Sequence, residues 1–183
     1  RIAGSESNRK VVSGSHLDTV NGGGKYDGGL GIVAALVAVA GLLEVYGRPR
    51  KTLEVLATCE EEGSRFRCNF WGSRAICELI EPWEASEIRD QDGISIADAM
   101  LSCGLDPKQI SKAVRNDIDA FIELHIEQGP ILESSGYSLG VVDRITGMRQ
   151  LEVNVTGRRD HAGTTPMDLR RDALVGVAEM IVG

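Results

Sequence analysis

The sequence predicts an α/β fold in which helices flank a mixed, largely parallel sheet. Two observations lead to this prediction. Residues 10–18 and 51–60 are apolar runs of strand length, and an apolar stretch of helical length lies between them. A strand, a helix and a second strand with short connections form a βαβ unit, in which the two strands lie parallel.

The first strand is predicted to end near His16, where a glycine-rich loop leads into an apolar helix that runs to about Gly47. Gly47 and Pro49 are typical of a helix end, and the second strand follows at Lys51. We expect the helix to be buried on all sides. A membrane span is the weaker alternative, because the run is of borderline length, carries Glu44 and is interrupted by glycines.

Three helical stretches are predicted after the second strand. They cover residues 72–80, residues 95–104 with Ser95 as N-cap, and residues 106–114 with Asp106 as cap and Pro107 at the first position. The run from Asp117 to Gln128 then alternates and returns to strand, which brings His125 to a strand end.

The pattern changes from about Ile145. Residues 147–158 alternate as a half-solvated antiparallel strand does, and a helix capped by Thr165 is predicted to follow. We expect one domain over residues 1–144 and the beginning of a second over residues 145–183, in a chain that is a piece of a longer protein.

Composition narrows the classes of function. The chain has 27 acidic and 20 basic residues and a net charge of −7, which argues against a nucleic-acid or anionic-membrane binder. The four cysteines form no C-x-x-C pair, and Cys59 and Cys77 lie in apolar surroundings. We therefore expect buried free thiols and a cytoplasmic location, rather than disulfides or a thiolate zinc site.

The glycine-rich loop has two nucleotide-binding interpretations, and neither fits. A phosphate-binding P-loop needs glycine at position 19 and serine or threonine at position 26. This chain has Thr19 and Tyr26 instead, so the motif fails at both ends. Gly29, Gly31 and Ala34 match a dinucleotide fingerprint, but about a dozen residues separate them from the strand, too many to place a pyrophosphate at the helix N-terminus.

A metal site is the third interpretation. Six potential ligands lie at or just beyond predicted strand ends: His16, Asp27, Glu60, Glu61, Glu62 and His125. Each alone has an ordinary structural explanation, such as a solvated turn or a helix cap. Together, carboxylates and imidazoles without thiolate suit Zn²⁺, Mn²⁺ or Co²⁺ in hydrolytic chemistry. Asp18 is expected to hold the second N–H of His16.

Four motifs in order, "GSHLDTV…GGKYDGGLG", "EEEGSRF", "ELHIEQGP" and "DHAGTTPM", resemble the amidohydrolase branch of the two-metal aminopeptidase-like hydrolases. This branch includes allantoate amidohydrolases, N-carbamoyl-L-amino acid hydrolases and β-ureidopropionases. The resemblance extends from His16 to Met167. It implies an aminopeptidase-like domain followed by an inserted α+β dimerisation (lid) domain, and a homodimer.

The resemblance also implies two divalent ions per complete subunit, Zn²⁺ or Mn²⁺ with Co²⁺ possible. His16 and His125 become ligands of one ion, Asp27 the bridging carboxylate and Glu62 a ligand of the second ion. Glu61 becomes the general base, and Glu60 the structural member of the triplet.

Two further roles follow from the resemblance. Gln128 contacts substrate, and His161 reaches the active site of the partner subunit to stabilise an oxyanion, whereas the spacing alone leaves a surface loop histidine equally open. The family's last metal-ligating histidine and its substrate-binding arginine lie outside these 183 residues. We therefore expect at most one well-held ion and no activity from this chain alone.

The function that the resemblance implies is hydrolysis of a ureido C–N bond in a small substrate that carries a carboxylate. Allantoate, converted to ureidoglycine, ammonia and CO₂ in purine nitrogen catabolism, is favoured because "NFWGS", with Phe70 and Trp71, looks closer to allantoate amidohydrolases. An N-carbamoyl-L-amino acid or a β-ureido acid is the alternative substrate. A non-catalytic binding or dimerisation module is the alternative of another class, and Glu61 argues against it because a binder needs no base.

Overall fold

The structure is a computed structural model that describes residues 1–147, 149 and 151–183. It divides into two compact units, Arg1–Ser138 and Leu139–Gly183, which are described separately. The predicted α/β class is confirmed, since the first unit combines a parallel sheet with helices.

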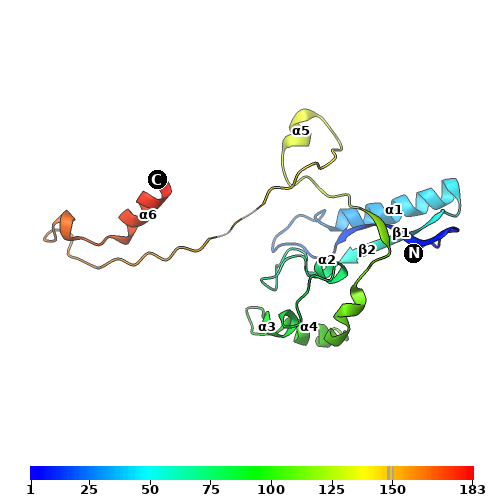
Figure 1. Ribbon diagram of the computed structural model, residues 1–183. Helices are drawn as coiled ribbons and strands as arrows, with labels where there is room; N and C mark the ends of the chain where they lie inside the picture. Colours follow the sequence, from blue (N-terminus) through cyan, green and yellow to red (C-terminus); the bar gives the residue numbers. More distant parts are fainter. Residues whose placement is uncertain (148, 150) are drawn as a thin grey trace. The chain divides into compact units, whose positions relative to one another are not determined.

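Three parallel strands form the sheet in the order β2-β1-β3 (Figure 1). They are β1 (Ser7–His16), β2 (Lys51–Thr58) and β3 (Ile118–Ile122). His16 pairs with Thr58, and Ser13 pairs with Ile122, the last residue of β3. The loops that follow the three strands therefore leave from the same edge of the sheet, as the predicted βαβ unit requires.

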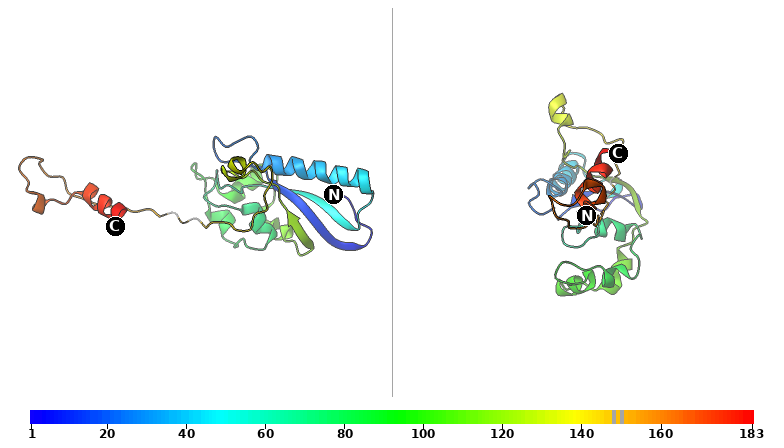
Figure 2. Two further views of the ribbon diagram at one scale, coloured as in Figure 1. Left: turned by 90° about the horizontal axis from the view of Figure 1, so that it is seen from above. Right: turned by 90° about the vertical axis from the view of Figure 1, so that its left-hand side faces the viewer.

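Helix α1 (Gly29–Tyr46) runs along one face of the sheet, where it contacts β1 and β2 (Figure 2). Its predicted bounds are confirmed, but the expected burial on all sides is wrong. Only Gly31 and Ala35 are buried, whereas Val37 and Val45 are 66% and 70% exposed. The reason is that no other described segment covers the outer face. By length and composition alone, the helix could cross a membrane.

The remaining elements of the first unit are short. Helix α3 (Glu84–Glu87) packs against α4 (Ile96–Ser102), and α4 and α2 (Trp71–Ile76) contact the 3₁₀ helix η1 (Pro107–Ala113). Helix α5 (Ile131–Ser135) follows β3. Both predicted caps are confirmed: Ser95 accepts the N–H of Asp98 at 3.0 Å, and Asp106 accepts that of Lys108.

The cysteines differ from expectation in their burial. Cys68 is buried with Phe66, Ile96 and Ala99 in a small core cluster beneath the helices. The exposure of Cys59 and Cys77 corrects the prediction that both are buried. Apolar sequence neighbours did not ensure burial because β2 is an edge strand and α2 is only one and a half turns long.

The second unit corrects two predictions. The helix expected from Thr165 is interrupted: η2 (Met167–Leu169) is followed by extended backbone at Arg170, and α6 (Ala173–Val182) begins only after Asp172, which accepts the N–H of Leu174 at 2.9 Å. Asp172, which directly precedes α6, caps this helix in place of the predicted Thr165.

The strand expected over residues 147–158 does not form in its described residues, and Met148 and Gln150 lie outside them. Leu151 and Val153 are exposed. An alternating segment becomes a strand only beside a partner strand, and no described segment of this unit supplies one.

A cluster of charged side chains joins the three strands of the sheet at their amino ends. The Arg115 guanidinium donates to Asp117 at 2.6 Å and to Glu54 of β2 at 2.8 Å, and Lys10 of β1 pairs with Asp117. The bonds from Arg115 and Lys10 hold the pKa of Asp117 well below its usual range. Asp117 is therefore ionised at neutral pH and links β3 to β1.

We predict that Asp117→Asn lowers the urea midpoint of unfolding at pH 7. Because the folded-state pKa is depressed, the stabilisation from this carboxylate is present above the unfolded pKa of about 4 and is lost as the pH falls below it. The deficit of the variant should therefore shrink below about pH 4. Asp92→Asn is the matched control, since Asp92 has no side-chain hydrogen bond or ion pair among the described residues. An equal effect of both substitutions would contradict the prediction.

Candidate metal centre

The loop after β1 is shaped around the ring of His16. Gly28, just after Asp27, has φ +68, which a residue without a side chain adopts readily. A Cβ at this position would lie 2.4 Å from the His16 carbonyl oxygen and 2.5 Å from its Nδ1. Glycine is required here because the backbone passes directly over the imidazole, and this close approach brings Asp27 beside His16.

Three ligand atoms converge at the carboxyl edge of the sheet. The Nε2 atoms of His16 and His125 lie 3.1 Å apart. Asp27 Oδ1 lies 3.2 Å from His125 Nε2 and 3.8 Å from His16 Nε2. His16 and Asp27 are buried, and their side chains are 3% and 7% exposed.

The hydrogen bonds of the two imidazoles fix where their protons lie. His16 Nδ1 is 2.6 Å from the backbone carbonyl of Asp18, and His125 Nδ1 is 2.9 Å from that of Ile126. A carbonyl oxygen only accepts, so each Nδ1 carries the ring proton and each Nε2 of a neutral ring presents a lone pair. Two lone pairs and a carboxylate oxygen therefore face one another.

These residues fit a divalent cation. Asp27 Oδ1 is buried and has no hydrogen-bond partner among the described residues. An unpartnered buried acceptor is costly, and a cation between it and the two nitrogens removes that cost. Two ligand atoms about 2.0–2.1 Å from a zinc ion at the tetrahedral angle lie about 3.3 Å apart, close to the spacing of the two imidazole nitrogens.

A second group shares His16. Ligand atoms of His16, Glu61 and Glu62 lie within 4.8 Å of one another. Glu62 is held by its backbone N–H, which donates to Asp18 Oδ2 at 3.0 Å, and this bond connects the loop after β2 to the loop after β1. Both acidic residues thus face the histidine from the neighbouring strand.

Glu60 has a different position from the other two glutamates. Its backbone is left-handed, with φ 57, and its carboxylate accepts the N–H groups of Arg65 and Phe66 at 3.2 and 3.1 Å. The N–H of Phe70 in turn donates to the Glu61 carbonyl at 2.9 Å. The Glu60 carboxylate therefore bonds to the backbone of the loop that follows β2 and stabilises that loop.

Asp18 contacts His16 in a way that the sequence did not predict. Its backbone carbonyl, and not its carboxylate, accepts from the imidazole. The carboxylate is used by the loop after β2 instead: burial alone would raise its pKa, but the backbone N–H groups of Glu62 and Glu61 hold the pKa of Asp18 below its ordinary value. This residue positions both loops of the site at once.

Glu61 has the electrostatic setting of a proton acceptor. Burial raises the pKa of its carboxyl, and the proximity of the His16 imidazole opposes that effect. The neighbouring charges of Glu62, Asp18 and Glu123 raise it further.

Glu123 was absent from the predicted site. It accepts a hydrogen bond from the buried hydroxyl of Ser15 on β1, and it lies two residues before His125. That spacing, in an alternating run, was the available signal, because residues two apart in extended chain face the same side.

The two remaining predicted residues belong to different units. Gln128, with φ 56, donates its side-chain amide to Asp27 Oδ2 at 3.0 Å, so it contacts the carboxylate that faces the histidines. His161 lies in the second unit, on an exposed turn. The structure thus brings together His16, Asp27, Glu61, Glu62, His125 and Gln128 in the first unit.

Comparison with known proteins identifies the family of this chain and several similar enzymes. Residues 12–182 match the family described as Peptidase family M20/M25/M40. The chain is 46% identical to an allantoate amidohydrolase of Bacillus subtilis, over 99% of this chain and 44% of that protein. It is 48% identical to an N-carbamoyl-L-amino-acid amidohydrolase of Paenarthrobacter aurescens, over 93% of this chain and 42% of that protein.

Solved structures give the same picture. A hydantoinase/carbamoylase family amidase from Burkholderia ambifaria superimposes with a TM-score of 0.71 at 32% identity, over 98% of this chain and 44% of that one. An amidase of the same family from Burkholderia multivorans gives 0.73 at 30% identity, again over 98% and 44%. The chain spans less than half the length of the relatives it matches.

We predict that His125→Ala weakens Zn²⁺ binding by at least about 100-fold, because it removes one of the three converging atoms. His161→Ala is the matched control, since His161 lies in the other unit. The measurement is competition with a chromophoric chelator, with folding checked by circular dichroism. Equal losses in the two variants would contradict the site.

We also predict that the chain retains at most one ion after dialysis. Two stoichiometric ions would contradict that expectation.

Proposed function

The chain belongs to the peptidase family M20/M25/M40, and on that premise we propose that this protein is a metal-dependent amidohydrolase that cleaves a ureido C–N bond. The observation that carries the proposal is the convergence of His16, Asp27 and His125, with Glu61 and Glu62 on the neighbouring loop. Named relatives that act on allantoate or on N-carbamoyl-L-amino acids support the choice of bond.

Divalent ions bound at such a site lower the pKa of water and polarise a carbonyl group, which is the chemistry that hydrolysis of an amide-like bond needs. His16, His125 and Asp27 would hold one ion, and Glu62 would belong to a second. We assign zinc or manganese, with cobalt also compatible with this donor set.

The chain's own residues supply the proton transfer. Glu61 lies beside His16, and no Lys or Arg among the described residues pairs with its carboxylate, so the carboxylate is free to accept a proton from the attacking water. It then delivers that proton to the leaving nitrogen. Gln128, which contacts Asp27, is placed to orient the substrate.

The proposed substrate is allantoate, with release of ammonia and CO₂ as ureidoglycine forms. Relatives of 46% and 49% identity are allantoate amidohydrolases, and one of 48% acts on N-carbamoyl-L-amino acids, so identity alone does not separate the two classes. The choice of allantoate rests on the resemblance of the stretch that holds Phe70 and Trp71, and Phe70 is 51% exposed in the structure.

The remaining assignments concern the whole protein. We propose a cytoplasmic homodimer in which His161 contributes to the partner's active site. No nucleic-acid or membrane partner is proposed, given the net charge of −7. A non-catalytic metal-binding module remains the alternative of another class, and it requires metal binding without turnover.

The test of the function is ammonia release by the full-length protein after the metal is removed and then restored as Mn²⁺ or Zn²⁺. Allantoate and an N-carbamoyl-L-amino acid are offered side by side. Metal-dependent release from one of them supports the hydrolase and identifies the substrate class. Binding of metal with silence on both substrates would support the non-catalytic module.

We predict that Glu61→Gln lowers turnover of the preferred substrate by about 10²–10⁴-fold, because the amide cannot accept the proton. Metal content should stay at the unsubstituted level, since the substitution keeps size and shape. Glu87→Gln, on the exposed face of α3, is the matched control and should leave turnover unchanged. Retained turnover in Glu61→Gln would rule out its role as base.

A further inference from the structure

His161 lies at the start of a tight turn in the second unit. The N–H of Thr165 donates to the His161 carbonyl at 3.2 Å and closes the turn. The imidazole folds over this turn, and its Nδ1 lies 3.1 Å from the backbone nitrogen of Gly163 and 3.2 Å from that of Thr164. The ring is therefore fixed by its own backbone.

These two contacts determine the tautomer of the neutral ring. Both backbone groups are N–H donors, so Nδ1 must present its lone pair to them, and the ring proton lies on Nε2. In the described part of the chain, Nε2 has no hydrogen-bond partner. His161 is exposed, and it thus offers an outward N–H donor.

Arg170 holds the same turn from the other side. Its guanidinium donates to the carbonyl of Thr165 at 3.0 Å and to the carbonyl of Ala162. Ala162 follows His161, and Thr165 ends the turn, so one side chain joins both limits of the turn. Arginine suits this task because its donors form a rigid fork, whereas the lysine ammonium is a single flexible point charge.

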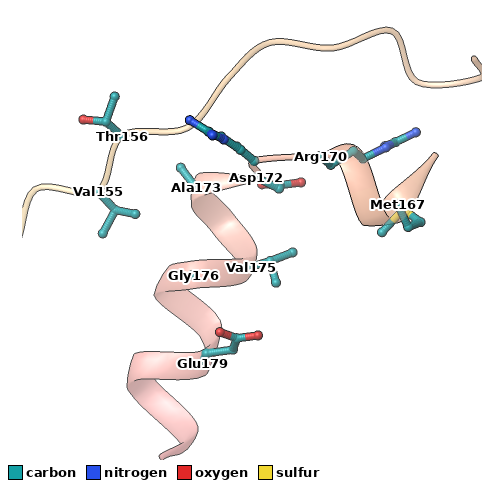
Figure 3. Close-up of a pocket in the computed structure, with 10 residues that line it drawn as sticks. Val155, Thr156, Met167, Arg170, Asp172, Ala173, Val175, Gly176 and Glu179 are labelled. Carbon is teal, nitrogen blue, oxygen red and sulfur yellow. The ribbon is translucent and has the colours of Figure 1, made fainter. Parts of the chain in front are cut away.

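Arg170 is half-buried, as is Thr165, which ends the turn. Its side chain points away from α6, so it does not serve the helix that follows (Figure 3). A second arginine reinforces the arrangement: the Arg158 side chain donates to Asp160 at 3.1 Å and to the Leu169 carbonyl at 2.9 Å. Arg158 therefore links Asp160, which precedes His161, to Leu169, which precedes Arg170.

We propose that Arg170 is a positioning residue that holds the 161–165 turn so that His161 presents its Nε2–H to an anionic group. Under the proposed function, with which this role of His161 stands or falls, that group is the oxyanion that develops on the ureido carbonyl. A donor aimed at developing charge accelerates the reaction only if it is already oriented. Arg170 supplies the orientation without touching the substrate.

The tautomer test uses the full-length protein labelled with ¹⁵N-histidine, with the His161 signals assigned from a His161→Gln spectrum. In the unsubstituted protein, the ¹⁵N shifts of His161 should report an unprotonated Nδ1 and a protonated Nε2. Arg170→Gln should shift the signals toward a mixture of tautomers, Arg170→Lys should fall between, and Arg171→Gln should leave them unchanged. Unchanged signals in Arg170→Gln would overturn the proposal.

The kinetic test separates positioning from a general structural role. Arg170→Gln should lower kcat by about 10- to 100-fold with little change in KM, because the interaction is made only in the transition state. In a His161→Gln background, Arg170→Gln should cost nothing further, since the two residues act as one unit. An equal loss in both backgrounds would assign Arg170 to folding and overturn the proposal.

The two proposals fail separately. If His161→Gln leaves turnover unchanged, the oxyanion role of His161 falls, and with it the catalytic meaning of Arg170. The ¹⁵N shifts then still show whether Arg170 fixes the tautomer. If turnover depends on His161 while the shifts and the double variant show no coupling to Arg170, the proposed function stands without this inference.

Discussion

The constraint on which the rest of the site depends is the meeting of three lone-pair atoms, His16 Nε2, His125 Nε2 and Asp27 Oδ1. His16 and Asp27 are buried, whereas His125 is exposed. Among the described residues no donor is bonded to Asp27 Oδ1, and both imidazole protons are directed to backbone carbonyls. Such an arrangement is unfavourable unless a cation lies at its centre. The arrangement therefore fits a divalent cation, and the neighbouring Glu61 and Glu62 contribute further carboxylates.

The sheet produces this meeting by its topology. All three strands run parallel, so the loops after them leave at one edge. Asp18 then locks two of these loops together, since its carbonyl fixes His16 and its carboxylate fixes the N–H of Glu62. Glycine at position 28 permits the approach of backbone to imidazole. Each device is small, but together they hold ligands from distant parts of the chain within hydrogen-bond distances.

The second unit also contains a histidine whose ring is oriented by its own backbone. Backbone atoms bond to one ring nitrogen of His161 and leave the other nitrogen without a hydrogen-bond partner among the described residues. His16 gives its Nδ1 proton to a carbonyl and keeps a lone pair on Nε2, whereas His161 accepts N–H groups at Nδ1 and keeps a proton on Nε2. One residue type thus presents a lone pair in the first case and an N–H donor in the second, because its backbone partners differ.

The sequence by itself determined the βαβ order and the caps at Ser95 and Asp106, because apolar periodicity and capping are local properties. It overestimated the third strand, which ends at Ile122 and leaves His125 three residues beyond it. It failed for the burial of Cys59 and Cys77, for the strand around Leu151 and for the helix expected from Thr165, where neighbours decide. Only the tertiary structure decided that the Nε2 atoms of His16 and His125, which are 109 residues apart in the chain, lie 3.1 Å from each other. It also decided that Asp18 uses its carbonyl and that Arg170 reaches back to the His161 turn. The physical reason is that strand register and long-range hydrogen bonds depend on which segments pack together, and residue types do not encode that locally.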